Sequence, residues 1–173
     1  MMIDRANTLL SLSVLIAVGL TASCGTDDSQ GRAAQAPTAA GTSAKVDLPT
    51  LADDKPRDYA GLHNVVAFHE GCYSGSVPEG AAGFDTLAAM GITTIISVDG
   101  AEPELEAAKA RGMRYIHLPI GYNGFNEQRK LQLVRATRDA LAEGPVYMHC
   151  HHGRHRSAGA AGTVIASLGL ATP

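Results

Sequence analysis

The stretch from residue 145 to residue 165 constrains the fold of this chain more than any other part of the sequence. It opens with an apolar run at 145–148, which is typical of a buried strand. A nine-residue polar loop from His149 to Ser157 follows, and the small residues at 158–165 indicate the first turns of a helix. Backbone N–H groups of such a loop and the positive end of the helix can converge on an anion. The order of these segments therefore predicts an anion-binding loop.

Two side chains of this loop suit an attack on phosphorus. Only the thiolate of Cys150 would be nucleophilic, and helix N-termini and nearby cations can lower a thiol pKa from ~8.5 to roughly 3.5–7.5. Arg156 follows after five intervening residues, about enough chain to encircle one phosphate. Its guanidinium can donate two hydrogen bonds to the same anion, and the loop amides can hold the remaining phosphoryl oxygens. We therefore expect Cys150 to be the nucleophile and Arg156 to bind the phosphate.

The same residues also have interpretations without chemistry. Cys150 would then be a buried structural thiol, Arg156 a solvated arginine at a helix start, and Ser157 an ordinary N-cap serine. The polar and basic residues around Cys150 argue against a structural thiol.

The loop matches the pattern His-Cys-(five residues)-Arg-Ser, which resembles the signature of the cysteine-dependent protein tyrosine and dual-specificity phosphatases. The matching positions are His149, Cys150, Gly153, Arg156 and Ser157.

Two further segments resemble the same family. Residues 71–78 read Gly-Cys-Tyr-Ser-Gly-Ser-Val-Pro, which is similar to the Tyr-Ser-Gly-x-x-Pro opening of the atypical dual-specificity phosphatases of bacterial type. Residues 115–120 are similar to the segment that precedes their general acid. The resemblance covers residues 62–170.

This resemblance implies a phosphoric monoester hydrolase that acts through a cysteinyl-phosphate intermediate, with no cofactor and no metal. Cys150 attacks, and Arg156 with the loop amides holds the transition state. The Ser157 hydroxyl then helps the sulfur to leave, and His149 orients the loop and supports a low pKa of Cys150. Gly153 supplies a backbone position at positive φ or in close approach to the anion.

The family's general acid is an aspartate, and this sequence lacks it. Asn123 stands at about the expected position, and an amide cannot deliver a proton. Three interpretations stay open: Glu127 as the acid, Asp99 as the acid, or no protein acid at all.

The loop between the cysteine and the arginine is unusually basic, and we expect it to form the substrate-binding wall. One interpretation is a rim for a second phosphate, as on inositol phosphates or phosphoinositides, and another is a solvated wall. A zinc site is the third, because imidazoles and thiolates are zinc ligands, but adjacent residues of a tight loop point in different directions. We therefore predict no metal. The wall residues are His151, His152, Gly153, Arg154 and His155.

Strand and helix signals alternate before the loop. The pattern predicts an α/β fold with three layers, a mostly parallel central sheet and helices on both faces. One helix follows the loop, whereas members of the family continue further, which leaves open whether C-terminal helices are missing. Strands are expected at 64–68, 71–75, 92–98, 113–118 and 145–148, and helices at 76–90, 103–111, 126–143 and 157–170.

The N-terminal part predicts export. An apolar run at 9–20 leads into Thr-Ala-Ser-Cys, which resembles a bacterial lipoprotein signal. We expect a signal peptide at 1–24 and a lipid on Cys24, with an ordinary cleaved signal or an uncleaved anchor as alternatives. Residues 25–58 lack helical or strand periodicity and are expected to be a flexible linker. The domain at 59–173 would then lie in the bacterial periplasm or cell envelope, anchored to the membrane.

Charge and cysteine content narrow the possible partners. The net charge of −3 means that the chain as a whole lacks the excess of basic residues that is typical of nucleic-acid-binding proteins. The three cysteines, Cys24, Cys72 and Cys150, do not form a disulfide framework. Cys72 is expected in the core, with a reversible disulfide to Cys150 as the alternative. The expected partners are a phosphorylated protein, or a small-molecule or inositol phosphate, and the membrane.

Two other functions stay open. A rhodanese-like sulfurtransferase also carries a cysteine in a basic loop after a strand, although its loop is usually shorter. The missing aspartate is also consistent with a catalytically weak module that binds phosphorylated ligands.

Overall fold

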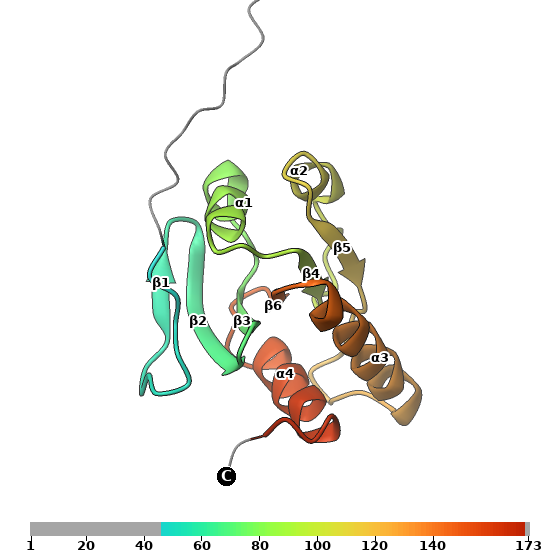
Figure 1. The fold of residues 1–173 in the computed structure, drawn as a ribbon. Helices are drawn as coiled ribbons and strands as arrows, with labels where there is room; N and C mark the ends of the chain where they lie inside the picture. The colour runs from blue at the N-terminus through green and yellow to red at the C-terminus, as the bar shows by residue number, and fades with distance from the viewer. Residues whose placement is uncertain (1–45, 172–173) are drawn as a thin grey trace, which may run out of the picture. The chain divides into compact units, whose positions relative to one another are not determined.

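The computed structural model describes residues 46–171, so the expected signal peptide and Cys24 lie outside the described residues. The described chain forms one six-stranded sheet with helices packed on it (Figure 1). The strands are β1 (Arg57–Tyr59), β2 (Leu62–His69), β3 (Cys72–Ser76), β4 (Thr94–Ser97), β5 (Arg114–His117) and β6 (Val146–Cys150), and the helices are α1 (Gly80–Ala89), α2 (Leu105–Lys109), α3 (Glu127–Glu143) and α4 (Arg156–Ser167).

The strand order is β1-β2-β3-β6-β4-β5. The β3–β6, β6–β4 and β4–β5 pairs are parallel, while β1–β2 and β2–β3 are antiparallel. Tight turns at Gly61 and Gly71, with φ of 69° and 73°, reverse the chain at the antiparallel edge. The α/β fold expected from the alternation of elements is confirmed, and the sheet is mixed because of this edge.

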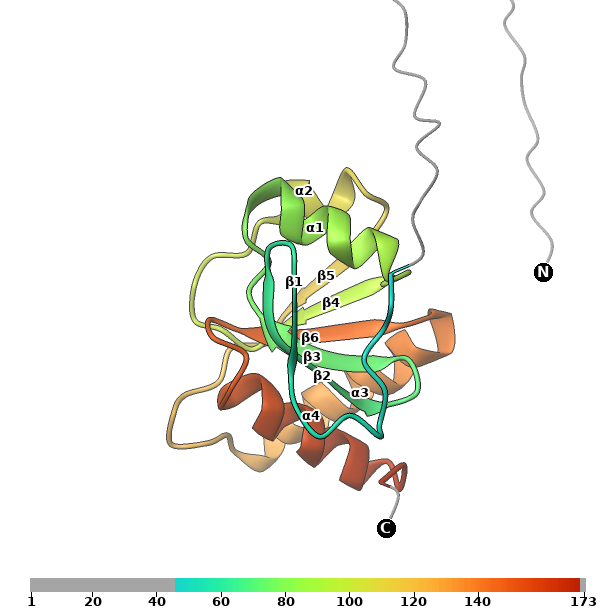
Figure 2. The same cartoon turned by 90° about the vertical axis from the view of Figure 1, so that its left-hand side faces the viewer.

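Helices cover both faces of the sheet, with α1 and α2 on one face and α3 and α4 on the other (Figures 1 and 2). The side chains of β6 alternate between the two cores. Tyr147 belongs to the cluster under α1 and α2, whereas Val146, Met148 and Cys150 belong to the cluster under α3 and α4. Consequently Cys150 and His149 lie on opposite faces of the central strand.

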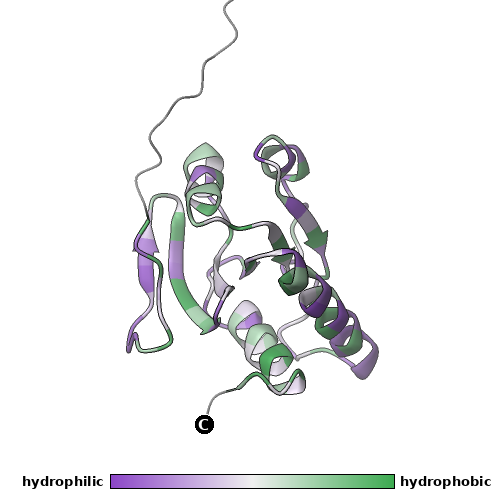
Figure 3. Ribbon diagram, viewed as in Figure 1, coloured by the Kyte–Doolittle hydropathy of each residue, from purple (hydrophilic) through white to green (hydrophobic). Residues whose placement is uncertain are grey.

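Helix α3 begins and ends where the sequence indicates. The Asn126 side chain accepts a hydrogen bond from the backbone N–H of Arg129 at 2.9 Å, and Gly144 follows the last residue. The buried residues of α3 are Leu133, Thr137 and Ala140, which lie on one face of the helix. Hydrophilic residues alternate with this buried set along the helix (Figure 3).

Helix α2 is shorter than the expected 103–111. Gly112 has a φ of 71°, and the carbonyl of Ala108 accepts hydrogen bonds from the N–H groups of both Arg111 and Met113, each at 3.0 Å. These bonds turn the chain out of the helix before residue 111. Only five residues, Leu105–Lys109, are helical.

The packed domain reaches further upstream than residue 59, which the sequence analysis gave as its first residue. Val46 and Leu48 pack against the core cluster under α1 and α2. Arg57 in β1 donates to Asp47 at 2.8 Å and to Asp53 at 2.9 Å. Residues 46–58 therefore contribute contacts to the fold instead of forming only linker. Within the described part of the chain, no helix has the length and apolarity needed to cross a bilayer.

Candidate active site

The candidate nucleophile lies at the carboxyl end of the central parallel strand. Cys150 is the last residue of β6 and is 3 % exposed. The ends of β3 and β4 lie beside it, since Ser76 pairs with Cys150 and Ser97 with His149. In parallel sheets this edge is where ligands bind.

Hydrogen-bond donors converge on the Cys150 sulfur. Burial raises the pKa of the thiol, but hydrogen bonds from the hydroxyl and backbone N–H of Ser157 and from the N–H groups of Gly153 and His155 together lower it below the ordinary value. The Ser157 Oγ lies 3.4 Å from the sulfur and 3.3 Å from the Gly75 carbonyl oxygen. Because a hydroxyl has one hydrogen, it can donate to the thiolate or to Gly75, but not to both. The loop amides thus face the sulfur.

Gly153 lies where a side chain has no room. Its φ is 73°, and a Cβ at this position would collide with the backbone of Gly75 and Ser76. The loop is also tied to the end of β3 by a bridge between Ser76 and His152. This close approach keeps the loop over the sulfur and explains a glycine at this position.

Arg156 is held on two sides. Its Nη2 donates to Asp99 Oδ2 at 3.0 Å, and its Cζ lies 4.6 Å from the centre of the Tyr122 ring. Its Nε is buried and has no hydrogen-bond partner among the described residues. The carboxylate and the aromatic ring hold the guanidinium in place, and one of its donors is unpaired. Such a guanidinium can bind an anion with little reorganisation.

Asp99 accordingly fits a positioning role better than the expected role of general acid. Burial raises the pKa of its carboxyl, but the N–H groups of Ala101, Gly100 and His151 and the charge of Arg156 bring the pKa below the ordinary value. An ionised carboxylate cannot donate a proton. Instead it joins the end of β4 to the anion loop and to the first residue of α4.

Glu127, the other candidate acid, lies in α3, and Asn123, at the expected position of the acid, lies in the turn before that helix. Glu127 is the first residue of α3, its side chain is 84 % exposed, and it pairs with Lys130 at 3.7 Å. Asn123 is exposed in a turn closed by a bridge between Gly121 and Gly124. It is Tyr122 of this turn that reaches Arg156. The turn thus brings an aromatic ring, and no carboxylate, over the guanidinium.

His149 supports the loop by position and not by charge. It is 1 % exposed, and the Tyr115 hydroxyl lies 2.6 Å from its Nε2. Burial lowers its pKa to about 4, so the imidazole is neutral near pH 7. A neutral imidazole cannot lower the pKa of Cys150 by its charge. The expected electrostatic effect of His149 on Cys150 is therefore absent near pH 7.

The basic wall residues lie around a hollow beside the loop. A cavity of about 400 Å³ is lined by the loop, by the start of β2 and by the end of β3. The rings of His151 and His152 meet edge to face, 4.4 Å apart. Among the residues the structure describes, no three His, Cys, Asp or Glu side chains converge closely enough to hold a metal ion. The cavity is lined by His63, Asn64, Ser76, Glu79, His151, His152, Arg154 and His155.

The alternative disulfide between Cys72 and Cys150 does not fit the sheet register. Cys72 pairs with Val146, four residues before Cys150 on β6. At ~3.3 Å per residue this separates the two cysteines by about 13 Å, whereas a disulfide needs Cα atoms within ~7 Å. Both thiols are free and buried, and burial raises the pKa of Cys72 to about 12. Cys72 is a core residue.

Sequence reasoning missed the two tyrosines that contact site residues. Tyr115 and Tyr122 stand in the segments around the expected acid, but nothing in their spacing indicates their partners. Tyr115 meets His149 because β5 and β6 both flank β4. Tyr122 meets Arg156 because its turn lies next to the start of α4. Both contacts depend on strand order.

Comparison with known proteins adds information on the fold. No protein-family model matches the chain, and no curated protein matches it. TpbA from P. aeruginosa has 20% sequence identity and a TM-score of 0.56, over 68% of this chain and 71% of its own. A DUF442 protein from Shewanella putrefaciens CN-32 has 18% identity and a TM-score of 0.57, over 65% and 77%. Kinase associated phosphatase, with its catalytic cysteine replaced by serine, has 14% identity and a TM-score of 0.51, over 67% and 76%. The described domain is phosphatase-like in fold.

Proposed function

We propose that this protein is a cysteine-dependent hydrolase of phosphoric monoesters, of the protein tyrosine and dual-specificity phosphatase type. One observation carries the proposal: N–H groups of Gly153, His155 and Ser157 face a buried sulfur whose pKa they lower. A thiolate with convergent amide donors suits a tetrahedral phosphoryl group. The phosphatase-like fold supports the same interpretation.

The reaction would proceed in two displacements. The Cys150 thiolate attacks phosphorus, an S–P bond forms, and the P–O bond to the leaving group breaks. Without a carboxylic acid in the turn at 121–124, the leaving oxygen takes its proton from water. A second water then attacks phosphorus, inorganic phosphate departs, and the Ser157 hydroxyl donates to the returning thiolate at the 3.4 Å contact. Arg156 binds phosphoryl oxygens in both steps.

Substrate choice would follow from the cavity beside the loop. The hollow has room for a group larger than phosphate, and its wall carries histidines and Arg154. A phosphorylated protein side chain or a small-molecule phosphate such as an inositol phosphate fits this description. Arg154 in this wall would bind a further anionic group on the substrate, and the carboxylate of Glu79 also lines the hollow.

The test is hydrolysis of para-nitrophenyl phosphate by the full chain. We expect turnover by the wild type and none by Cys150→Ser, with a phosphoenzyme trapped by acid quench in the wild type alone. A panel of phosphopeptides, phosphoinositides and inositol phosphates then ranks the substrates. Thiocyanate formation from thiosulfate and cyanide, with no phosphate release, would instead select the sulfurtransferase.

A phospho-ligand-binding module is the second candidate, and the lack of a carboxylate in the Asn123 turn favours it. Binding of a phosphopeptide without phosphate release, abolished by Arg156→Ala, would select this function over the hydrolase.

We further propose that the domain is exported and anchored through a lipid on Cys24, which lies outside the described residues. Expressed in a bacterial host, the full chain should pellet with the membranes, whereas Cys24→Ser should appear in the periplasmic extract. Equal distribution of the two proteins would contradict the anchor.

A further inference from the structure

Asn64 adopts a left-handed backbone conformation that residues other than glycine rarely take. Its φ is 55°, and it has the only positive φ of any non-glycine residue among those described. It lies where the β1–β2 register shifts, between the Tyr59–Leu62 and Arg57–Val65 pairs. Bulges of this kind redirect a side chain. Strained residues persist where surrounding contacts hold them, and they gather at functional sites.

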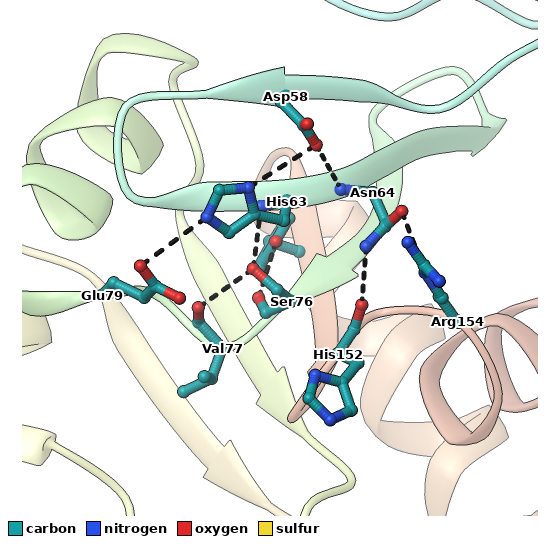
Figure 4. A network of polar contacts seen from close by, with 9 residues as sticks. Asp58, His63, Asn64, Ser76, Val77, Glu79, His152 and Arg154 are labelled. Carbon is teal, nitrogen blue, oxygen red and sulfur yellow. Dashed lines mark hydrogen bonds and ion pairs between the residues drawn. The ribbon is translucent and has the colours of Figure 1, made fainter.

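The contacts of Asn64 explain how the strain is held. Its backbone N–H donates to Asp58 Oδ1 at 2.9 Å. Its side chain points to the anion loop, where Nδ2 donates to the His152 carbonyl oxygen at 3.0 Å and Oδ1 accepts from Arg154 Nε at 3.2 Å (Figure 4). One amide thus binds the residues immediately before and after Gly153.

The N–H of Gly153 is one of the loop N–H groups that lower the pKa of the Cys150 thiol, and its backbone packs against Gly75 and Ser76 at the end of β3. Glycine has no Cβ to restrict its backbone, so Gly153 adopts its φ of 73° without holding that conformation by itself. The orientation of its N–H therefore depends on the contacts of its two neighbours. Asn64 supplies a side-chain contact to each of them.

We propose that Asn64 is a positioning residue that fixes the anion loop on both sides of Gly153 and so keeps the loop N–H groups directed at the Cys150 sulfur. The role in turnover rests on the proposed phosphatase function, whereas the effect on the sulfur does not. Asp58 holds the strained backbone of Asn64. The antiparallel edge of the sheet would therefore influence Cys150 indirectly, through Asn64 and the anion loop.

The experiment measures the sulfur directly, without substrate. Alkylation of Cys150 by iodoacetamide is followed against pH in the full chain, by mass spectrometry of the Cys150 peptide, so that other cysteines do not interfere. Asn64→Gly keeps the positive φ accessible and removes both side-chain contacts. Asn64→Ala removes the same contacts and adds strain, because alanine lacks the short polar side chain that lets asparagine tolerate a positive φ.

We expect both variants to move the alkylation midpoint upward by roughly 0.5–1 pH unit, since one donor to the thiolate is loosened. Thermal unfolding should separate them, with a clear loss of Tm for Asn64→Ala and a smaller one for Asn64→Gly. With para-nitrophenyl phosphate, kcat should fall in both while KM changes little. Asn126→Ala, which removes the cap of α3 and no loop contact, controls for general loss of stability and should leave the midpoint unchanged.

The outcomes are distinct. An Asn64→Gly protein with the wild-type alkylation midpoint would overturn the proposal and leave Asn64 a local turn residue. A midpoint shift in Asn126→Ala equal to that of Asn64→Gly would also overturn it, because loss of stability would explain both. A wild-type midpoint at an ordinary thiol value, with no ester hydrolysis, would instead count against the proposed function.

Discussion

At the scale of single residues, the phosphoryl transfer that we propose divides into tasks for separate side chains. Cys150 receives amide donors from its own loop, and Arg156 keeps a buried Nε without a partner among the described residues. Asp99 fixes the guanidinium at 3.0 Å, and its lowered pKa keeps it ionised. The missing task is protonation of the leaving oxygen.

Asn123→Asp tests this missing task. A carboxyl in the turn over Arg156 could protonate the leaving group, and one general acid typically contributes ~10²–10⁴-fold. Turnover of an alkyl phosphate should therefore rise more than that of para-nitrophenyl phosphate, whose phenolate leaves without a proton. Steady-state kcat for the two esters is the measurement, with Asn123→Ala as the control. Equal gains on both esters would argue against an acid role.

At the scale of elements, the ion pair between Asp99 and Arg156 connects the end of β4 with the start of α4. Both side chains are largely buried, at 11% and 12% exposure. Removing one partner of such a pair leaves the other uncompensated. The pair therefore fixes how α4, and with it the loop, sits on the sheet.

Asp99→Asn keeps the shape and removes the charge. We expect kcat/KM for para-nitrophenyl phosphate to fall roughly 10-fold, because a charge-assisted hydrogen bond that orients Arg156 becomes a neutral one. The pH dependence decides between the two roles of Asp99. If it only positions Arg156, the alkaline limb of the pH–rate profile stays in place, whereas loss of that limb in the variant would restore Asp99 as the acid.

At the scale of the whole molecule, His149 connects the stability of the fold to pH. Its pKa is about 4 in the folded protein and ~6.5 in an unfolded chain. Between these values the unfolded chain binds a proton that the folded chain does not. Stability from this residue is therefore complete above pH ~6.5 and declines as the pH falls toward 4.

The expected size of this effect is roughly 3 kcal/mol across the window. The free energy of unfolding by urea at pH 7.5, 5.5 and 4.5 measures it in the wild type and in His149→Gln. The variant should lose less stability than the wild type between pH 7.5 and pH 4.5. Parallel curves for the two proteins would show that His149 does not carry the pH dependence.

The strand–loop–helix order could be predicted because it is local: the apolar run, Cys150 and Arg156 are neighbours along the chain. The pair of Asp99 and Arg156 could not be predicted, because it requires β4 to lie beside β6. The contact of Asn64 with the loop spans 88 residues and depends on the strand order β2-β3-β6. The periodicity of apolar residues predicts individual helices and strands. Which strands become neighbours in the sheet depends on tertiary packing, which no short motif encodes.

The alternation along β6 has a consequence for refolding. A shift of that strand by one residue would exchange its two faces, placing the imidazole of His149 among the apolar side chains under α4 and moving the sulfur away from the amides. A slipped molecule would keep its helices and strands and so escape detection by circular dichroism. Titration of the reactive thiol at a pH below the ordinary thiol pKa would therefore count correctly paired molecules in a refolded preparation.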